Sequence, residues 1–576
     1  MSYNNTDAVF PNFKNCFGLR NLLILLSGAV VLALVVTGYY LKHEDPAYYW
    51  DWGAYFDMYQ NFGQTVRHNN RWFARLLVTI RNDDYNLLPI SFLAPLSIAF
   101  QTSRWAYIAG ITIFYLIPAA AVTAICAAFC VTGNKNKNTA LPGKAGFAGL
   151  FLAALIFHHY WAPTLRGLPD IVGLIPLGLA TLLLMRSKFL TQASWRTILC
   201  FALLAWLTFA LRRWYAFSIV SMMVMASLMA ALTLITQQDR KKHFYHLVKA
   251  YAATGIVIVI LLTILQHTLV HRILVTSYQE AYIAYQAPFM SQLNTVLYSI
   301  GPLYTLLFIV GIGLAIINRN QFVLFCASCA ILTFVLFSRT QAPGIHHLLP
   351  IFFWMVVVSG YTVLMLFAHL SGWTVKIGTA ALLVYGALSW GIVFSPALSA
   401  RLQPFHSTFP MERLFPLHVE NMPEYTKLIA QIKAQTKNGE KFAVFSSGGE
   451  LTTAVLFAFD HSLEPQLAWP SQIDARDHML LAPLEAPLAI VTDQPITHLA
   501  PKDQQVITLP NDCIFNHHDF GTAYQQVAGP FVMSEGHKAY IYRRTRPLSD
   551  ADIEWIQEQL NHSYPAWKWN HAGMIE

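Results

Sequence analysis

The stretch NLLILLSGAVVLALVVTGYYLKHEDPAYYWDWGAYFDMYQ, residues 21–60, contains a long apolar run followed by a segment rich in aromatic and acidic residues. The apolar run at 21–41 is long enough to cross the roughly 30 Å of hydrocarbon in a bilayer as a helix. No small-residue cleavage pattern follows it, only GYYLKHEDP, so the run is predicted to be a retained anchor and not a signal peptide. Asp51 and Asp57 then lie where the chain leaves the lipid.

The composition of the whole chain supports a membrane location. Of its 576 residues, 55% are hydrophobic and only 12% are charged, and the mean hydropathy is +0.43. These values are too apolar for a soluble enzyme and indicate a polytopic α-helical membrane protein in contact with membrane lipids. The formal net charge is +8, but the basic residues form no dense run. The charge therefore indicates that some loops are more basic than others, and nucleic acid is not expected as a partner.

Apolar runs of about 15–25 residues recur along the first 397 residues and predict about eleven membrane spans. The spans are expected near residues 21–41, 106–131, 145–163, 171–185, 197–211, 214–236, 248–270, 298–318, 321–338, 349–370 and 375–397. The segment 87–100 is predicted to be a juxtamembrane or re-entrant helix, because a crossing there would move the following basic loop to the outer side.

Basic residues concentrate in alternate loops. The basic loops contain Lys14 and Arg20; Lys135, Lys137 and Lys144; Arg186, Lys188 and Arg196; Arg240, Lys241 and Lys242; Arg319; and Lys376. Because short cytoplasmic loops are enriched in Lys and Arg, this pattern places the N-terminus in the cytoplasm and everything after the eleventh span outside. A bacterial inner membrane with a periplasmic C-terminal domain suits the retained anchor and the single cysteine of that domain, Cys513.

Two domains are predicted. Residues 1–397 form a transmembrane domain, with a first outer loop at 42–86, and residues 398–576 form a soluble, non-cytoplasmic α/β domain. In the second domain, KFAVF and APLAIV are typical of buried strands, and GGELTTAVLFAF and SDADIEWIQEQL are typical of helices. The last of these begins with a Ser or Asp suited to an N-cap.

The polar residues of the predicted outer side form the candidate site. They are Asp51, Asp57, Asp83, Asp84, Arg166, Asp170, Arg212, Arg213, His271, Arg272, Tyr278, Glu280, Arg339, His346 and His347. The cytoplasmic loops contain mostly isolated Lys and Arg, which orientation alone explains. The site is therefore expected to face outward, next to the C-terminal domain.

The adjacent pair Arg212 and Arg213 runs against the positive-inside trend. Guanidinium groups bind phosphate through paired donors, so the pair is predicted to bind a phosphate. Snorkelling to lipid headgroups and an internal ion pair are the alternatives. Arg339 lies at the end of a span, where the same two interpretations, phosphate binding and snorkelling, apply.

The carboxylates of the first outer loop are candidates for acid–base chemistry. Asp51 near the interface can act as a general base toward an acceptor hydroxyl, or it can be an N-cap of the helix that follows. Asp57 is a candidate for orienting an acceptor or binding a metal ion, and a position on a solvated helix face is the alternative. Asp83 and Asp84 can cap the next helix, orient an acceptor or bind a divalent cation such as Mg²⁺ or Mn²⁺. A metal role for His346 and its neighbour is disfavoured, because adjacent helical residues point about 100° apart.

Two features of the first outer loop resemble a known superfamily. Asp51 is followed four residues later by Tyr55, and the acidic, Pro-bearing motif DYNLLP, which contains Asp84 and Pro89, precedes a short helix. This arrangement is similar to that of the GT-C membrane glycosyltransferases, most closely the protein O-mannosyltransferase and lipid A aminoarabinose transferase branches. The resemblance covers the whole architecture, from the cytoplasmic N-terminus to the outer C-terminal domain.

The resemblance implies an inverting transfer of a sugar from a polyprenyl-phosphate carrier to a glycan, lipid or protein acceptor on the outer face. Asp51 corresponds to the acidic residue of the family's first loop, although Trp52 follows where relatives often have Glu. Asp84 and Pro89 correspond to the next loop motif, with longer spacing. Arg212, Arg213 and Arg339 are then expected at the carrier phosphate. The residues expected near the sugar or acceptor are Tyr55, Arg166, Asp170, Arg272, Tyr278, Glu280 and His346.

Two other classes of function fit parts of the pattern. A transporter or flippase of a lipid-linked glycan would also need an outward cavity containing Arg and Asp, together with intramembrane charges and repeat symmetry. A non-enzymatic envelope assembly factor would leave the outer polar cluster unexplained. The glycosyltransferase hypothesis accounts for the largest number of these residues.

Overall fold

The computed structural model describes residues 19–69, 71–132, 144–186, 193–235, 240–370, 372–436, 438–565 and 567. Four basic residues used for the predicted orientation, Lys14, Lys135, Lys137 and Lys188, lie outside this part of the chain. The chain divides into two compact units. The helical unit comprises Met1–Lys42, Tyr55–Val275 and Ala287–Pro416, and the mixed unit comprises His43–Ala54, Thr276–Gln286 and Leu417–Glu576.

The described residues of the helical unit are mostly in helices. Its helices are α2 (Leu19–Lys42), α3 (Trp50–His68, whose first turn belongs to the mixed unit), α4 (Trp72–Asn82), α5 (Leu88–Ser91), α6 (Ala94–Ala99), α7 (Arg104–Ile111), η1 (Thr112–Leu116), α8 (Ile117–Thr132), α9 (Lys144–Leu155), α10 (His158–Arg166), η2 (Pro169–Gly173), α11 (Leu174–Arg186), α13 (Trp195–Leu211), η3 (Arg213–Tyr215), α14 (Ala216–Ile235), α15 (Arg240–Leu265), α16 (His267–Val275), α18 (Phe289–Ile300), α19 (Pro302–Ile317), α20 (Gln321–Phe337), α21 (Leu349–Phe367), α22 (Gly372–Phe394), α23 (Pro396–Arg401) and η5 (Gln403–Thr408).

Six of the described helices are long and apolar enough to cross a membrane, and a bent pair of helices makes a possible seventh span. The six are Arg20–Lys42, Arg104–Val131, Arg213–Leu232, Arg240–Leu265, Leu349–Phe367 and Gly372–Phe394. Four shorter apolar helices coincide with other predicted spans: Gly146–Leu155, Pro169–Met185, Trp195–Leu211 and Gln321–Phe337. The chain is therefore a mainly helical integral membrane protein, as its composition predicted.

Two predicted spans are broken, which the apolar pattern did not indicate. The run at 298–318 is split by Gly301, which has φ +86°, and by Pro302, so α18 and α19 meet at an angle of 103°. Proline suits the first turn of α19, where its missing N–H costs nothing. The run at 145–163 ends as α9 and restarts as α10 at His158. The predicted segment 87–100 consists of the short helices α5 and α6.

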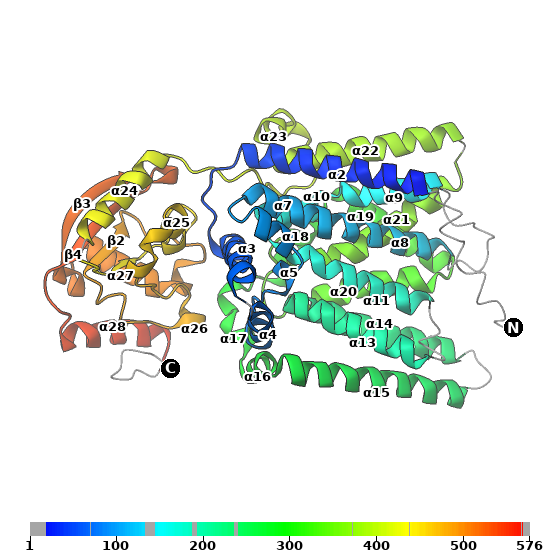
Figure 1. Ribbon diagram of the computed structural model, residues 1–576, viewed down its shortest axis with the longest axis horizontal. Coiled ribbons are helices and arrows are strands. Elements are labelled where there is room, and N and C mark those ends of the chain that lie inside the picture. Colours follow the sequence, from blue (N-terminus) through cyan, green and yellow to red (C-terminus); the bar gives the residue numbers. More distant parts are fainter. Residues whose placement is uncertain are drawn as a thin grey trace. The chain divides into compact units, whose positions relative to one another are not determined.

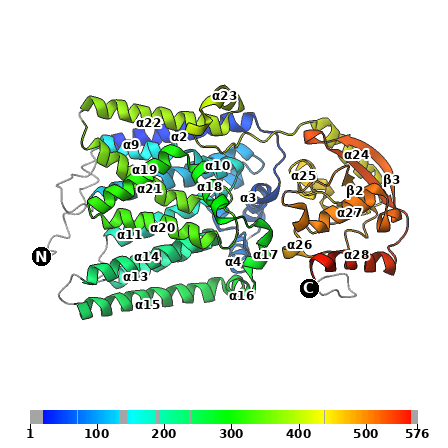
Figure 2. The ribbon, with the colours of Figure 1, turned by 180° about the vertical axis from the view of Figure 1, so that it is seen from behind.

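Helix α21 forms the centre of the helical unit. It packs against α8, α19 and α20, and 78% of its apolar window is buried, compared with 17% for α2 and for α15. Both views of the ribbon show α2 and α22 along one edge of this unit and α15 along the opposite edge (Figures 1 and 2). Small residues permit close helix contacts, since a Cβ added at Gly360 would lie 2.9 Å from Ala127 Cβ.

The mixed unit contains a four-stranded sheet with helices on both faces. Its elements are α17 (Tyr278–Ala281), η4 (Ile283–Tyr285), α24 (Met422–Gln435), β1 (Phe442–Val444), α25 (Thr453–Phe459), η6 (His461–Gln466), α26 (Asp474–Asp477), β2 (Leu488–Thr492), η7 (Pro501–Asp503), α27 (Gln505–Asn516), η8 (Asp519–Ala523), β3 (Tyr524–Val532), η9 (Ser534–Gly536), β4 (Lys538–Arg544) and α28 (Asp550–Ser563). The strand order is β1-β2-β4-β3, with β1 parallel to β2 and the other pairs antiparallel.

The strand β1 is apolar throughout because both of its faces are covered. Phe442 and Val444 pack with residues of α24 and α25, whereas Ala443, between them, packs with residues of α27 and α28. Figure 1 shows α24 and α27 within this unit. The two strands and two helices predicted from the sequence are present, and Ser549 is the N-cap of α28 in a capping box with Asp552.

The boundary between the units differs from the predicted one at 397/398. Residues 398–416 belong to the helical unit, because their backbone is hydrogen-bonded to it. Leu414 N donates to Val393 O at 2.8 Å, and Met411 N donates to Tyr298 O at 2.9 Å. Residues 43–54, predicted as part of the first outer loop, belong to the mixed unit, where Asp45 N donates to Leu417 O at 2.8 Å.

Candidate functional site

The turn LRRWY contains two adjacent arginines, Arg212 and Arg213, that differ in backbone conformation. Helix α13 ends at Leu211, Arg212 is extended with φ −156° and ψ 118°, and Arg213 begins the 3-10 turn η3. Both side chains are buried, at 2% and 8% exposure respectively. Because the backbone changes conformation between them, each guanidinium reaches a different carboxylate.

Arg212 pairs with Asp170. The Arg212 Nε donates to Asp170 Oδ1 at 2.6 Å, and Arg212 Nη1 donates to the hydroxyl of Tyr55. Asp170 is held in η2, just after Gly167, whose φ of +90° ends helix α10 in the left-handed region. Within the described residues, Asp170 Oδ2 is buried and has no hydrogen-bond partner.

Arg213 and Arg272 share Asp84. Arg213 Nη1 lies 2.5 Å from Asp84 Oδ2, and Arg272 Nη2 lies 3.0 Å from Asp84 Oδ1. The Arg213 guanidinium also lies over the Trp214 ring, 4.4 Å from its centroid. Arg272 is 43% exposed, so this end of the cluster is open.

Asn86 fixes the loop that carries Asp84. Its Oδ1 accepts from Leu88 N at 2.9 Å, and its Nδ2 donates to Ala210 O at the end of α13 at 2.8 Å. The interpretation of Asp83 and Asp84 as caps of the following helix is therefore wrong: Asp83 is the C-cap of α4, and Asn86 supplies the side-chain oxygen at the start of α5. The amide side chain anchors the loop to α13 and so places Asp84 beside Arg213.

These groups form what we call the arginine cluster: Arg212, Arg213 and Arg272 with Asp84 and Asp170. Asp83, which interacts with Arg272, lies beside this cluster, so three guanidiniums face three carboxylates and the formal charge is 3 − 3 = 0. The internal ion pair, one alternative for the adjacent arginines, is therefore present for both. Guanidinium groups at a partly open site suit an anionic ligand, because they offer paired donors to its oxygens.

Three predicted site residues belong to the mixed unit: Asp51, Tyr278 and Glu280. Asp51 lies in the first turn of α3, which begins at Trp50, so it is not the N-cap of that helix. Tyr278 stacks on Tyr282 with ring centroids 6.0 Å apart. Glu280 is exposed in α17.

The remaining predicted residues lie in the helical unit. Asp57 is half-buried on α3, two turns beyond its start. Arg166 Nη2 donates to Phe415 O at 2.9 Å and so holds the segment that leads to the mixed unit. Arg339 is exposed after α20 and takes part in no ion pair among the residues that the structure describes.

Partial burial raises the pKa of Asp83, the adjacent Arg272 lowers it, and Asp84 raises it again. Around Asp83 and Asp84, the described part of the chain brings together no group of three possible metal ligands. Both oxygens of Asp84 are engaged by arginine. These residues do not form a site that fits Mg²⁺ or Mn²⁺, so no step is assigned to a cation.

A histidine group lies elsewhere in the helical unit and has the spacing of a metal site: His158, His159 and Glu412. His159 Nδ1 lies 2.9 Å from Glu412 Oε2, and His159 Nε2 lies 2.8 Å from Ile345 O. His158 Nε2 lies 2.7 Å from Ser299 O. Three ring nitrogens are thus already hydrogen-bonded, which suits a structural network that ties α10 to neighbouring loops.

His347 is packed behind the arginine cluster. Its ring lies 4.8 Å from that of Trp214 and 3.9 Å from that of His346, and its Nδ1 accepts from Gly344 N at 3.0 Å. Burial lowers the pKa of His347 well below its usual value of about 6.5, and the charges of His346, Arg212 and Arg213 act in the same direction. The neutral ring supports the cluster without adding charge.

This depressed pKa predicts a loss of stability in acid. The unfolded chain binds a proton at His347 below about pH 6.5 and the folded chain does not, so the free energy of unfolding should fall by about 1.4 kcal/mol per pH unit below that value. We expect the melting temperature of the detergent-solubilised protein to fall between pH 7 and pH 5, and this fall to be smaller for His347→Gln. The exposed His369→Gln is the matched control; an unchanged pH dependence for His347→Gln would contradict the prediction.

Two residues support the arginine cluster in a way that the sequence did not predict: Asn86, which fixes the loop of Asp84, and His347, which packs on Trp214. Asn86 lies inside the quoted motif DYNLLP, but its bond to Ala210 joins residues 124 positions apart. His347 belongs to the predicted outer polar residues, but its contact with Trp214 joins residues 133 positions apart. The only sequence signal available for either residue was its place beside a motif already selected.

Comparisons with known proteins bear on the fold. The chain matches the crystal structure of ArnT from Cupriavidus metallidurans bound to undecaprenyl phosphate, with a TM-score of 0.51 and 11% identity over 91% of this chain and 98% of that one. The apo structure of the same protein gives a TM-score of 0.49 and 10% identity over the same shares. No protein-family model and no curated protein sequence matches. The predicted resemblance in fold to a GT-C membrane glycosyltransferase of the aminoarabinose transferase type is confirmed.

Proposed function

We propose that this protein is an inverting membrane glycosyltransferase that moves a sugar from a polyprenyl-phosphate carrier to an envelope glycan, lipid or protein. The observation that carries the proposal is the arginine cluster, a partly open site with three guanidinium groups in a chain that has the ArnT fold. The structure matched is of ArnT bound to undecaprenyl phosphate, which is consistent with a lipid phosphate as the anion.

In the proposed reaction, the oxygen of an acceptor hydroxyl attacks the anomeric carbon of the carrier-bound sugar. A carboxylate takes the hydroxyl proton, the new glycosidic bond forms, and the bond to the carrier oxygen breaks. The carrier phosphate leaves with the electron pair. Arg213 and Arg272 would stabilise its charge through charge-assisted hydrogen bonds.

Arg212 has a different proposed role from Arg213. Its side chain is 2% exposed and is bonded to Asp170 and Tyr55. It therefore supports the site from behind, whereas Arg213 and the more exposed Arg272 contact the phosphate. Arg339 is exposed and takes no part in the ion pairs of the arginine cluster. It can bind the carrier phosphate only if the carrier lipid reaches the turn after α20.

Asp51 is the proposed general base, on its correspondence to the first-loop acid of the superfamily. Asp84 is less suited because both of its oxygens are engaged by arginine. Asp83 is the second candidate, since its pKa is raised and a base works best when its pKa lies near the operating pH. Tyr278, Glu280 and His346 remain proposed contacts of the sugar or acceptor.

Mass spectrometry of envelope lipids and glycans from cells with and without the gene tests the proposal. Loss of one sugar, restored by the wild-type protein and not by Arg213→Ala, is the expected result and identifies both donor and acceptor class. An unchanged sugar inventory together with an altered distribution of a lipid-linked glycan between leaflets would instead support a flippase. That alternative is not favoured, because the arginine cluster lies at helix ends and not in the middle of a span.

The proposed orientation has about eleven spans, an outward site and a periplasmic C-terminal region. Asn438 lies in an exposed turn of the mixed unit, whereas Gln321 is exposed at the start of α20, beside the basic Arg319. We predict that Asn438→Cys is labelled by a membrane-impermeant maleimide in intact spheroplasts and that Gln321→Cys is labelled only after permeabilisation, with the parent protein as background. The reverse pattern would overturn the orientation and the outward site together.

A further inference from the structure

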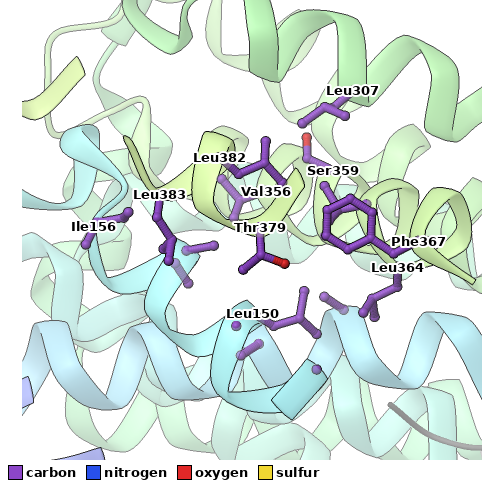
Figure 3. A pocket seen from close by; sticks show the side chains of 18 of the residues that line it. Leu150, Ile156, Leu307, Val356, Ser359, Leu364, Phe367, Thr379, Leu382 and Leu383 are labelled. Atoms are coloured by element: carbon purple, nitrogen blue, oxygen red, sulfur yellow. The ribbon is translucent and has the colours of Figure 1, made fainter. Parts of the chain in front are cut away.

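The helical unit contains a cavity of about 500 Å³ between α8, α9, α19, α21 and α22. Its lining is almost entirely aliphatic and small. Figure 3 shows Leu150 of α9, Leu364 of α21 and Leu383 of α22 around one shared space. A space of this volume lies within the range of ligand pockets in proteins.

Four polar side chains of this cavity are hydrogen-bonded within the protein. Thr123 Oγ1 donates to Ala119 O at 2.8 Å, and Ser359 Oγ donates to Met355 O at 2.9 Å. Thr379 Oγ1 donates to Val375 O at 2.8 Å, and the Tyr385 hydroxyl donates to Thr408 O at 3.0 Å. With these donors engaged, the walls are suited to a hydrocarbon chain and not to a polar ligand.

One charged residue lies at an end of the cavity. Lys376 is exposed near the start of α22 and lines the cavity together with Phe367 at the end of α21. Helix α21 starts at Leu349, two residues after His347, and its 19 residues span about 28 Å. Lys376 is therefore near the opposite end of α21 from the arginine cluster.

The length of the cavity fits one leaflet. Its lining on α22 extends from Val375 to Tyr385, a separation of ten positions or about 15 Å along the helix. Half of the bilayer hydrocarbon is about 15 Å thick. A lipid chain that starts at a headgroup beside Lys376 would thus fill the cavity within its own leaflet.

We infer that this cavity binds an acyl chain of an anionic glycerophospholipid from the leaflet at the Lys376 end, with the lipid phosphate paired to the Lys376 ammonium. The inference depends on the apolar walls, the position of the cation and the length of the cavity. These three observations do not depend on the proposed transfer reaction, but the exclusion of the carrier lipid rests on the proposed function. The carrier lipid is a poorer candidate, because its phosphate is proposed to bind at the other end of α21.

Two glycines provide a matched pair of variants. A Cβ added at Gly149, which lines the cavity on α9, would meet nothing within 4 Å, and the same is true of Gly313 on α19, which does not line it. Gly149→Phe should therefore fill the cavity without a backbone clash. Gly313→Phe adds the same bulk elsewhere and controls for a general effect of the larger side chain.

Native mass spectrometry of the full-length protein tests the inference with three separate probes: phosphatidylglycerol, phosphatidylcholine and undecaprenyl phosphate. We expect wild-type and Gly313→Phe proteins to retain phosphatidylglycerol in preference to phosphatidylcholine. Gly149→Phe should lower the retained phosphatidylglycerol by about tenfold. Lys376→Gln should lower it by about fivefold and remove the preference for the anionic headgroup.

Three results would overturn the inference. They are full retention of phosphatidylglycerol by Gly149→Phe, no change with Lys376→Gln, and displacement of phosphatidylglycerol from the wild type by undecaprenyl phosphate, whose own retention Gly149→Phe then removes. The last result would assign the cavity to the carrier chain. Melting temperatures of all variants, recorded in parallel, separate lost binding from lost folding.

Discussion

Replacing Asp51 with Asn is expected to lower sugar transfer by about 100-fold or more, because general-base catalysis typically contributes a factor of this size. The amide keeps the size and hydrogen-bonding shape of the carboxylate but does not take up the acceptor proton. Asp51 lies in the first turn of α3, where a negative charge is only mildly stabilising, so the fold should survive. Transfer from a polyprenyl-phosphate sugar by the protein in vesicles measures the effect.

Asp57→Asn, on the same helix, and Asp83→Asn are the matched variants. If Asp51 is the base, Asp57→Asn should transfer nearly as fast as the wild type, and the melting temperatures of both proteins should agree. A well-folded Asp51→Asn protein with normal transfer would eliminate the assignment. A large loss in Asp83→Asn would then identify Asp83, whose pKa is raised, as the base.

Arg213→Ala is expected to weaken use of the lipid-phosphate donor by roughly 10- to 100-fold. Removing one partner of a charge-assisted contact in a partly dehydrated site costs about 1.5–3 kcal/mol. Arg213→Lys keeps the charge but loses the planar pair of donors, so it should have a smaller but clear effect. The loss should appear mainly in the KM for the donor, measured at saturating acceptor.

Arg81 provides a control for the removal of a nearby exposed charge, since it lies in the last turn of α4 and is exposed. Arg81→Ala should leave donor use unchanged. The buried Arg212→Ala differs from both, because it leaves Asp170 unpaired and should lower the melting temperature as well as activity. If Arg213→Ala and Arg213→Lys both use the donor normally, Arg213 is a structural ion-pair partner only, and Arg272 or Arg339 must bind the phosphate.

Local patterns were sufficient for the class of the fold. In the absence of water a backbone must satisfy its own hydrogen bonds, so apolar runs of membrane length form helices regardless of their neighbours. The run at 21–41 became α2, and that at 349–370 became α21. The breaks were harder to predict, since Gly301 and Pro302 lie inside an apolar run and cause the bend only through local backbone geometry.

The candidate site could be identified only from the local sequence motifs and the tertiary structure together. The residue types of LRRWY and RNDDYNLLP already indicated a phosphate site and a carboxylate loop. Which carboxylate each arginine meets was not readable, because Asp84 lies 129 positions from Arg213 and 188 positions from Arg272. Asn86 anchors the loop of Asp84 to α13 through one hydrogen bond to Ala210. A contact between residues so far apart in the chain leaves no periodic signal in the sequence.

The sequence by itself determined that this is a helical membrane protein with a mixed C-terminal region and an unusual concentration of Arg and Asp outside the basic loops. Those properties follow from composition and short-range periodicity, which depend on neighbouring residues only. The tertiary structure decided which charges pair, that residues 398–416 pack on the helical unit, and that a cavity lies beside Lys376. These features arise where distant segments pack together, and packing depends on the shape of every surrounding side chain.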